Sequence, residues 1–198
     1  MRLPESAHAS RPWRIHELTG DFSLEDVWAL PTPGGPGDFP RLVELIASFD
    51  PARSSYAAVR ALFGVREKVG EALGWEDAGS GPDKAAAERP DGRRSLRERL
   101  PADLRDGPPA PEFAAFPFTQ LYLTGEEWAV EAINRTVHGV LHFGWVAGDD
   151  GLHRGQMAIY VRRNGLLGAA YMAAIAPFRH AVVYPRIMRE LEREWPRN

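Results

Sequence analysis

The stretch VHGVLHFGWVAGDDGLHRGQMAIYVRRNG, residues 137–165, decides the fold of this chain. Hydrophobic and other residues alternate through 136–146 and again through 153–163, a period of two that is typical of strands with one buried face. The segment Gly148-Asp149-Asp150-Gly151 between them is a strong turn signal. The stretch therefore predicts a β-hairpin, and one face of it carries Val137, Leu141, Phe143, Trp145, Met157, Ile159 and Val161.

Further strands are expected on both sides of this hairpin. Before it, residues 118–124 and 128–134 are predicted to form two strands joined around Gly125-Glu126. After it, Asn164-Gly165 predicts another tight turn, because both residues tolerate positive φ. The apolar run 166–176 that follows is interpreted as either a central strand or one wall of a cavity.

The N-terminal residues give weaker signals. Residues 13–18 alternate weakly, which suggests a first strand. Residues 21–28 are predicted to form a short helix, with Ser23 as its N-cap and Asp26 at the capping-box position three residues later. The segment 31–40 is rich in Pro and Gly and is predicted to be a loop.

Three more segments show helical periodicity. Apolar residues recur at helical spacing over 42–49, a longer helix is predicted over 54–73, and a short one over 95–104. Residues 76–94 are polar, low in complexity and rich in Gly, Pro and Ala. We interpret them as a mobile loop inside a single domain that spans residues 1–198, because neither the segment before the loop nor the segment after it is expected to fold as a domain by itself.

The C-terminal residues predict one long amphipathic helix. Pro177 takes the favoured first position. Pro185 lies inside the helix, where it removes the hydrogen bond to the carbonyl of Ala181 and should produce a kink. Arg179 falls in the middle of the polar arc and is therefore expected to face solvent. The apolar side comprises Phe178, Ala181, Val182, Tyr184, Met188, Leu191 and Trp195.

Composition is that of an ordinary globular domain. Of 198 residues, 44% are hydrophobic and 26% charged, and the net charge is −3. This net charge does not favour electrostatic binding to nucleic acid or to an anionic membrane. The absence of cysteine excludes disulfides and thiolate chemistry. Residues 1–11 contain no apolar region of the kind a signal peptide needs, so none is expected. The longest near-apolar stretch, 166–178, is shorter than the roughly 20 residues that span a bilayer. A cytoplasmic protein is expected.

The segments VHGVLHFGWV (137–146) and MAIYVRRNGLLGAAYMAAIAPFRHAVVYPRIM (157–188) resemble a bacterial family, domain of unknown function 2867. The order of elements also resembles the helix-grip fold of birch-pollen-allergen, START-like and polyketide-cyclase-like proteins. This resemblance implies an α+β fold, in which a curved antiparallel sheet wraps around a long C-terminal helix and leaves a cavity for an apolar ligand. The family has no agreed catalytic residues, so none is carried over.

Candidate ligand-binding residues follow from the inner face of the sheet and from the helix. Mostly apolar lining with a few polar groups is typical of small-molecule sites. A tightly filled core is the alternative interpretation of the same side chains, although nearby alanines at 169, 170, 173 and 174 leave volume unoccupied. His180 and Tyr184, one helical turn apart, are either a base and a phenol facing the pocket or ordinary boundary residues. The candidate residues are Phe143, Trp145, Met157, Ile159, Tyr171, His180 and Tyr184.

Two other groups of polar residues are expected to be solvated. His138 and His142 lie on one strand, roughly 13 Å apart, which is too far to share a metal ion. They alternate with the apolar face and are therefore predicted to face solvent. Glu126-Glu127 lies at a predicted turn and is also expected to be exposed. We expect neither a metal site nor a cofactor, and the sequence contains no P-loop, Gly-x-Ser-x-Gly or His-Glu-x-x-His.

The sequence thus predicts a protein that binds a small hydrophobic or aromatic ligand. The alternative is an interaction module with a filled core, which could form a homodimer. A cyclase- or dehydratase-like enzyme that uses His180 or Tyr184 as acid or base is a further alternative.

Overall fold

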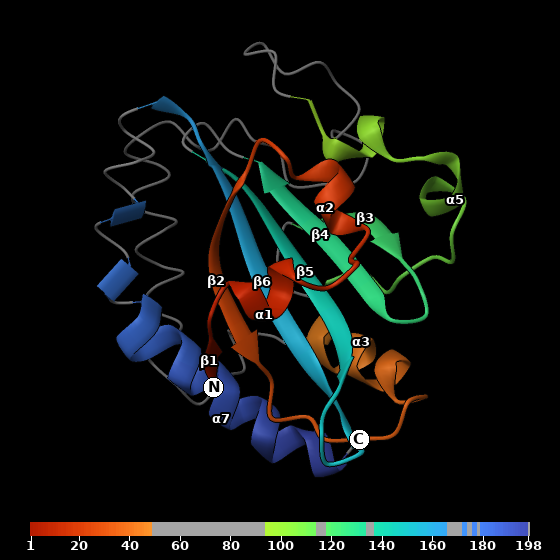
Figure 1. The fold of residues 1–198 in the computed structure, drawn as a ribbon, viewed down its shortest axis with the longest axis vertical. Helices are drawn as coiled ribbons and strands as arrows, with labels where there is room; N and C mark the ends of the chain where they lie inside the picture. The colour runs from red at the N-terminus through yellow and green to blue at the C-terminus, as the bar shows by residue number, and fades with distance from the viewer. Residues whose placement is uncertain are drawn as a thin grey trace.

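The structure is a computed structural model, and an antiparallel sheet of six strands forms its centre (Figure 1). The strand order is β1-β2-β6-β5-β4-β3. The predicted helix 54–73, the predicted loop 76–94 apart from Arg94, and Tyr171 lie outside the described residues. The structure describes residues 1–48, 94–113, 118–133, 137–165, 172–173, 176–177 and 179–197.

The second half of the chain forms the sheet by local pairing. The strands β3 (Thr119–Leu123), β4 (Glu127–Ile133), β5 (Val137–Ala147) and β6 (His153–Arg163) pair antiparallel in sequence order. The predicted hairpin is confirmed, and Gly151 in its turn has a φ of 79°, a left-handed conformation that favours glycine.

The N-terminal elements differ from the prediction. Residues 21–28 were expected to be helical, but Ser23–Ala29 form strand β2, which pairs with β6, and the short edge strand β1 (Arg2–Leu3) pairs with β2. The predicted strand 13–18 is wrong as well, because Ile15–Leu18 form helix α2. Pairing with a distant strand outweighs local capping signals at β2. Helix α1 (Ser6–Ala9) precedes α2.

Two predicted helical segments are confirmed. Helix α3 spans Phe39–Ala47 and follows the Pro- and Gly-rich loop. The segment 95–104 divides into the 3₁₀ helix η3 (Leu96–Arg99), which the Ser95 side chain caps, and the helix α5 (Ala102–Arg105).

The C-terminal segment is helical but changes its helical type. A π-helical turn, η4, spans Arg179–Val183, helix α7 spans Tyr184–Glu194, and a 3₁₀ turn, η5, spans Trp195–Arg197. Pro185 is the second residue of α7 and directly follows the π-helical turn, so it lies inside the helical segment, as predicted. Of the predicted strand 166–176, the described residues 172, 173 and 176 are helical, so that prediction is wrong for them. In the part of the chain that the structure describes, no helix is long and apolar enough to cross a membrane.

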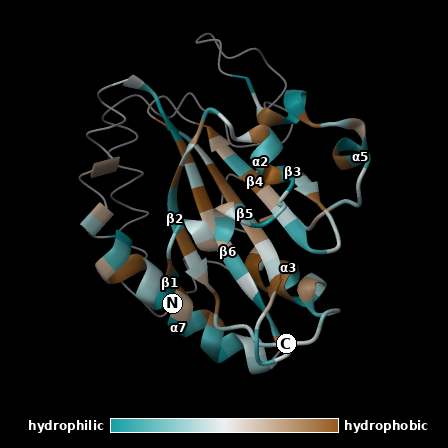
Figure 2. Ribbon diagram, viewed as in Figure 1, coloured by the Kyte–Doolittle hydropathy of each residue, from teal (hydrophilic) through white to brown (hydrophobic). Residues whose placement is uncertain are grey.

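Hydrophobic side chains cover both faces of the sheet, and Figure 2 shows hydrophobic residues along its strands. One face packs against α3 and α7, and we call it the helix face; it holds Trp28, Trp128, Phe143 and Met157 together with Tyr184. The opposite face, which we call the N-terminal face, packs against α2 and the segment 96–104. Figure 1 shows α1 and α2 across this second face.

Gly144 in β5 marks a close approach on the N-terminal face. A Cβ at this position would come within 2.8 Å of the Trp13 ring, whereas a Cβ at Gly139 would meet nothing closer than 3.9 Å. We expect Gly144→Ala to lower the free energy of unfolding by about 1–3 kcal/mol, as overpacking does, and Gly139→Ala to change it by less than about 1 kcal/mol. Urea unfolding measures both, and equal losses would contradict the Trp13 contact.

Candidate ligand site around Asp26

A β-bulge in β2 aims the carboxylate of Asp26 at the helix face. Leu24 pairs with Tyr160 and Asp26 pairs with Ile159, so the register shifts at the residue between them. In a regular strand Leu24 and Asp26 would share a face, because side chains alternate with a period of two. The extra residue instead sends Leu24 to the N-terminal face and Asp26 toward α7.

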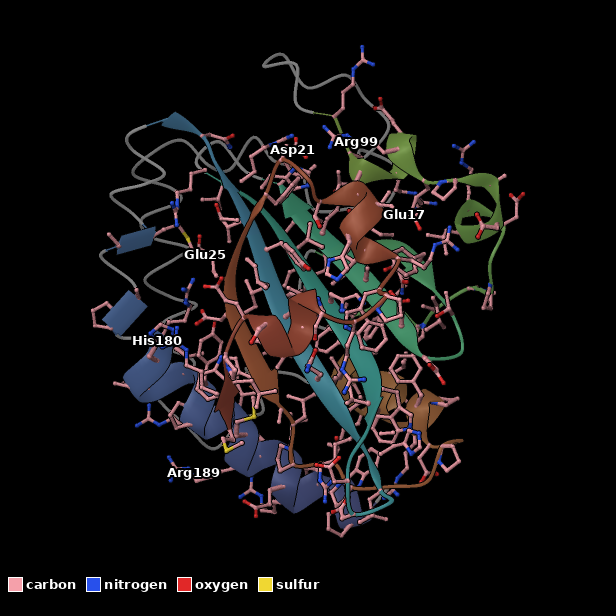
Figure 3. The ribbon with its side chains drawn as sticks, in the orientation of Figure 1. Glu17, Asp21, Glu25, Arg99, His180 and Arg189 are labelled. Atoms are coloured by element: carbon pink, nitrogen blue, oxygen red, sulfur yellow. The ribbon has the colours of Figure 1, made fainter. Side chains whose placement is uncertain are left out.

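Four side chains converge on this carboxylate. The Asp26 side chain has no exposed surface. Its Oδ1 lies 2.6 Å from His180 Nε2 and 3.3 Å from an Arg2 guanidinium nitrogen. Its Oδ2 lies 2.9 Å from Arg179 and accepts a hydrogen bond of 3.1 Å from the Tyr184 hydroxyl. Figure 3 shows His180 at the start of the C-terminal helix, on the side of β2.

The π-helical turn explains why Arg179 points inward. Tyr184 lies five positions after Arg179, more than one α-helical turn of 3.6 residues. A π turn closes between residues i and i+5 and so brings both to one side. The prediction that Arg179 faces solvent is therefore wrong, since its side chain is only 14% exposed and pairs with Asp26.

The charges of this cluster do not balance. Asp26 contributes one carboxylate, and Arg2 and Arg179 contribute two guanidinium groups. Burial raises the pKa of Tyr184; the charge of Arg179 opposes this effect and the charge of Asp26 adds to it. The phenol therefore stays protonated and donates its hydrogen bond to Asp26. The Nε of Arg179 is buried and has no hydrogen-bond partner in the part of the chain that the structure describes.

The tautomer of His180 follows from its partner. A carboxylate only accepts hydrogen bonds, so Nε2 of His180 carries the proton that it shares with Asp26. In the neutral ring, Nδ1 is then the nitrogen without a proton. The side chain is 30% exposed, so this ring lies at the boundary between the buried cluster and the surface.

Asp26 stands at the end of an apolar row that crosses the sheet. The register places it beside Ile159, and Ile159 beside Leu141 and then Val130. Leu141 and Ile159 are only partly buried, unlike the fully packed residues of the neighbouring row. That row is mainly aromatic and consists of Trp128, Phe143, Met157 and Trp28.

The structure brings together most of the sheet residues that the sequence singles out. Phe143, Trp145, Met157 and Ile159 all lie on the helix face. Trp145 nevertheless lies far along β5 from the Asp26 row, where its indole donates to the carbonyl of Gly35 over 2.9 Å.

His180 and Tyr184, expected to be either a base and a phenol facing a pocket or ordinary boundary residues, contact the same side chain. They share Asp26, which the sequence interpretation placed in a helix cap. The only available signal for Asp26 was a charged residue followed directly by Val27 and Trp28, a combination also typical of a strand with one polar position.

The predictions of solvated side chains on the opposite face are wrong. His138 and His142 have no exposed surface. Their Nε2 atoms lie 2.7 Å from Glu131 and 3.1 Å from Glu127, respectively. Glu127, also expected to be exposed, accepts hydrogen bonds from the Tyr122 hydroxyl as well. The N-terminal segment covers this face, so alternation along β5 marks two buried faces rather than one.

Comparison with known proteins gives one match. The family described as "Protein of unknown function (DUF2867)" matches residues 18–186. The chain belongs to this family. Asp26, Arg179, His180 and Tyr184 all lie inside the DUF2867 region, whereas Arg2, α1 and most of α2 precede it. No curated protein and no solved structure matches the chain.

Proposed function

We propose that this DUF2867 protein binds a small, largely apolar ligand between the helix face of its sheet and the C-terminal helix. The Asp26 cluster carries the proposal, because it is a buried polar group at the end of a partly exposed apolar row. Apolar walls with a few fixed polar groups are typical of small-molecule sites. The proposed helix-grip fold, with a C-terminal helix lying across one face of an antiparallel sheet, is consistent with a ligand in this position.

The charge of the cluster favours a ligand that carries an acidic oxygen. Two guanidinium groups face one carboxylate, which leaves an excess positive charge. The buried Nε–H of Arg179 has no acceptor among the described residues, and an unsatisfied buried donor is costly. A carboxylate oxygen of a ligand would satisfy this donor, and the apolar body of the ligand would pack on Leu141 and Ile159.

Cinnamate and its uncharged amide, cinnamamide, test the proposal. We expect cinnamate to raise the melting temperature, and Arg179→Gln to weaken its binding by about tenfold or more, as loss of a charged hydrogen bond does. Arg189→Gln, an exposed arginine on the same helix, should leave binding unchanged. Calorimetric titration below the melting temperature of each variant measures the affinity.

Native mass spectrometry of the purified protein completes this test. A copurified small-molecule mass would support the ligand site. If no small-molecule mass appears and no tested compound raises the melting temperature, the ligand site is wrong. An interaction module with a filled core, visible as a dimer mass, would then be the better description.

The Asp26–His180 pair favours acid–base catalysis as a second candidate function. A carboxylate that holds one imidazole nitrogen orients the other as a general base, and the distance of 2.6 Å fits this role. Once a ligand is known, turnover should be lost in His180→Ala, and Tyr184→Phe should show whether the phenol also transfers a proton. Full turnover in both variants would exclude both groups from catalysis.

A further inference from the structure

Three buried ring nitrogens on the N-terminal face have no hydrogen-bond partner among the residues that the structure describes: His8 Nε2, Trp13 Nε1 and His142 Nδ1. They belong to neighbouring rings from α1, the following loop and β5. The ring centroids lie 5.0 Å apart for His8 and His142, 5.4 Å for Trp13 and His142, and 6.0 Å for His8 and Trp13. Buried polar atoms are nearly always paired, so these three atoms require a partner other than the described residues.

The hydrogen bond of His142 Nε2 determines whether its Nδ1 is a donor or an acceptor. Its Nε2 lies 3.1 Å from Glu127 Oε2. Burial acts to raise the pKa of Glu127. The hydrogen bond and charge interaction with His142 outweigh burial, and the hydrogen bonds from the Arg14 backbone N–H and the Tyr122 hydroxyl add to this effect, so the pKa of Glu127 is lowered. Glu127 is therefore ionised and accepts, so Nε2 of His142 carries a proton. Burial lowers the pKa of His142, so the ring is neutral and its Nδ1 presents a lone pair.

His8 presents a lone pair as well. Its Nδ1 lies 2.7 Å from Gln156 Oε1, and the amide nitrogen of Gln156 donates to the carbonyl of Ala7, which fixes the orientation of the amide. Nδ1 therefore carries the proton. Burial, with the nearby His142 adding to it, lowers the pKa of His8 to about 3, so the ring is neutral near pH 7. Trp13 offers only an N–H donor.

We propose that one buried water molecule binds among His8, Trp13 and His142. Water donates two hydrogen bonds and accepts at least one, which matches two imidazole lone pairs and one indole N–H. About three hydrogen bonds are typical of a buried water. A metal ion fits less well, because the indole N–H directs positive charge toward the site. The described residues also contain no group of three or more His, Asp or Glu arranged to hold a metal.

This water would connect the N-terminal segment to the sheet. It completes a hydrogen-bonded chain from Tyr122 through Glu127 and His142 to His8 and Gln156. The chain joins β3, β4, β5 and β6 to α1, and so gives the docking of α1 a directional polar contact in addition to its apolar packing.

Water–protein cross-relaxation in the NMR spectrum of the full chain tests the proposal. We expect a cross-peak between water and the Trp13 indole proton, with the sign of a long-lived contact. The Trp128 indole is the matched control, because it is buried and donates to Gln120 Oε1 over 3.2 Å, and should show none. In His8→Phe, which removes one of the two acceptors, the Trp13 cross-peak should weaken or disappear.

Two results would overturn the proposal. One is the absence of a Trp13 cross-peak in the wild-type protein at conditions where its indole proton is resolved. The other is stoichiometric Zn²⁺ in the purified protein that His142→Phe removes, which would identify the common partner as a metal ion. A crystal structure with one density peak in hydrogen-bonding range of all three nitrogens, and no anomalous signal, would support the water directly.

Discussion

Asp26→Asn is expected to lower the free energy of unfolding by about 3–5 kcal/mol, the usual cost of removing one partner from a buried ion pair. The Asp26 carboxylate has no exposed surface, and the guanidinium of Arg179 that pairs with it is only 14% exposed. The variant leaves this cation without its counter-charge and weakens the bonds from His180 and Tyr184. Arg2 adds little, because its side chain is 56% exposed.

Asp21→Asn is the matched control for this experiment. Asp21 also pairs with two arginines, Arg99 and Arg162, each at 2.7 Å, but its side chain is 43% exposed. Figure 3 labels Asp21 and Arg99 at the end of the sheet away from His180. Surface pairs contribute about 0–1 kcal/mol, so the control should lose no more than that in urea unfolding. Similar losses in the two variants would show that Asp26 is not buried as described.

Acidification should destabilise the protein progressively between about pH 6.5 and about pH 3. Burial, with the nearby His142 adding to it, lowers the pKa of His8 from 6.5 to about 3. Over this range the unfolded chain binds a proton at His8 that the folded chain does not. The free energy of unfolding therefore falls as pH decreases, by up to ~1.4 kcal/mol per pH unit for this residue. Burial also lowers the pKa of His142, which acts in the same direction.

His8→Phe isolates the contribution of His8. The variant keeps an aromatic ring on α1 but cannot bind a proton. We expect it to be less stable than the wild type at neutral pH and to lose less stability on acidification, so that the two curves converge. Urea unfolding in a series of buffers between about pH 7 and about pH 4 measures the slopes. Parallel curves would mean that His8 is protonated alike in the folded and unfolded chains.

Local patterns in the sequence predicted the elements whose partners are close in the chain. The hairpin of β5 and β6 follows from alternation and one turn, and α3 from its apolar spacing. Strand β2 was missed because its partner β6 lies more than a hundred residues away, and a local capping pattern occupies the same residues. Topology of this kind is not visible in a short sequence window.

The sequence predicted the residues that the C-terminal helix contributes to the candidate site, but not the residue that the sheet contributes. The spacing of His180 and Tyr184 placed them one helical turn apart, but their shared partner Asp26 required both the strand β2 and its bulge. Arg179 was placed on the wrong side because a helical wheel assumes 3.6 residues per turn, and a π turn does not obey it. His142 was expected in solvent because alternation shows that two faces differ, but not that α1 and α2 cover the second.

The response of His180 to a ligand is the most direct test of the Asp26 site. In long-range ¹H–¹⁵N spectra of the full-length protein titrated with cinnamate, the Nδ1 resonance of His180 should move with saturation, and Nε2 should stay protonated. His153, which lies six residues before Ile159 on β6, should not respond. Saturable binding of cinnamate that leaves both His180 nitrogens unchanged would place the ligand elsewhere and contradict the site.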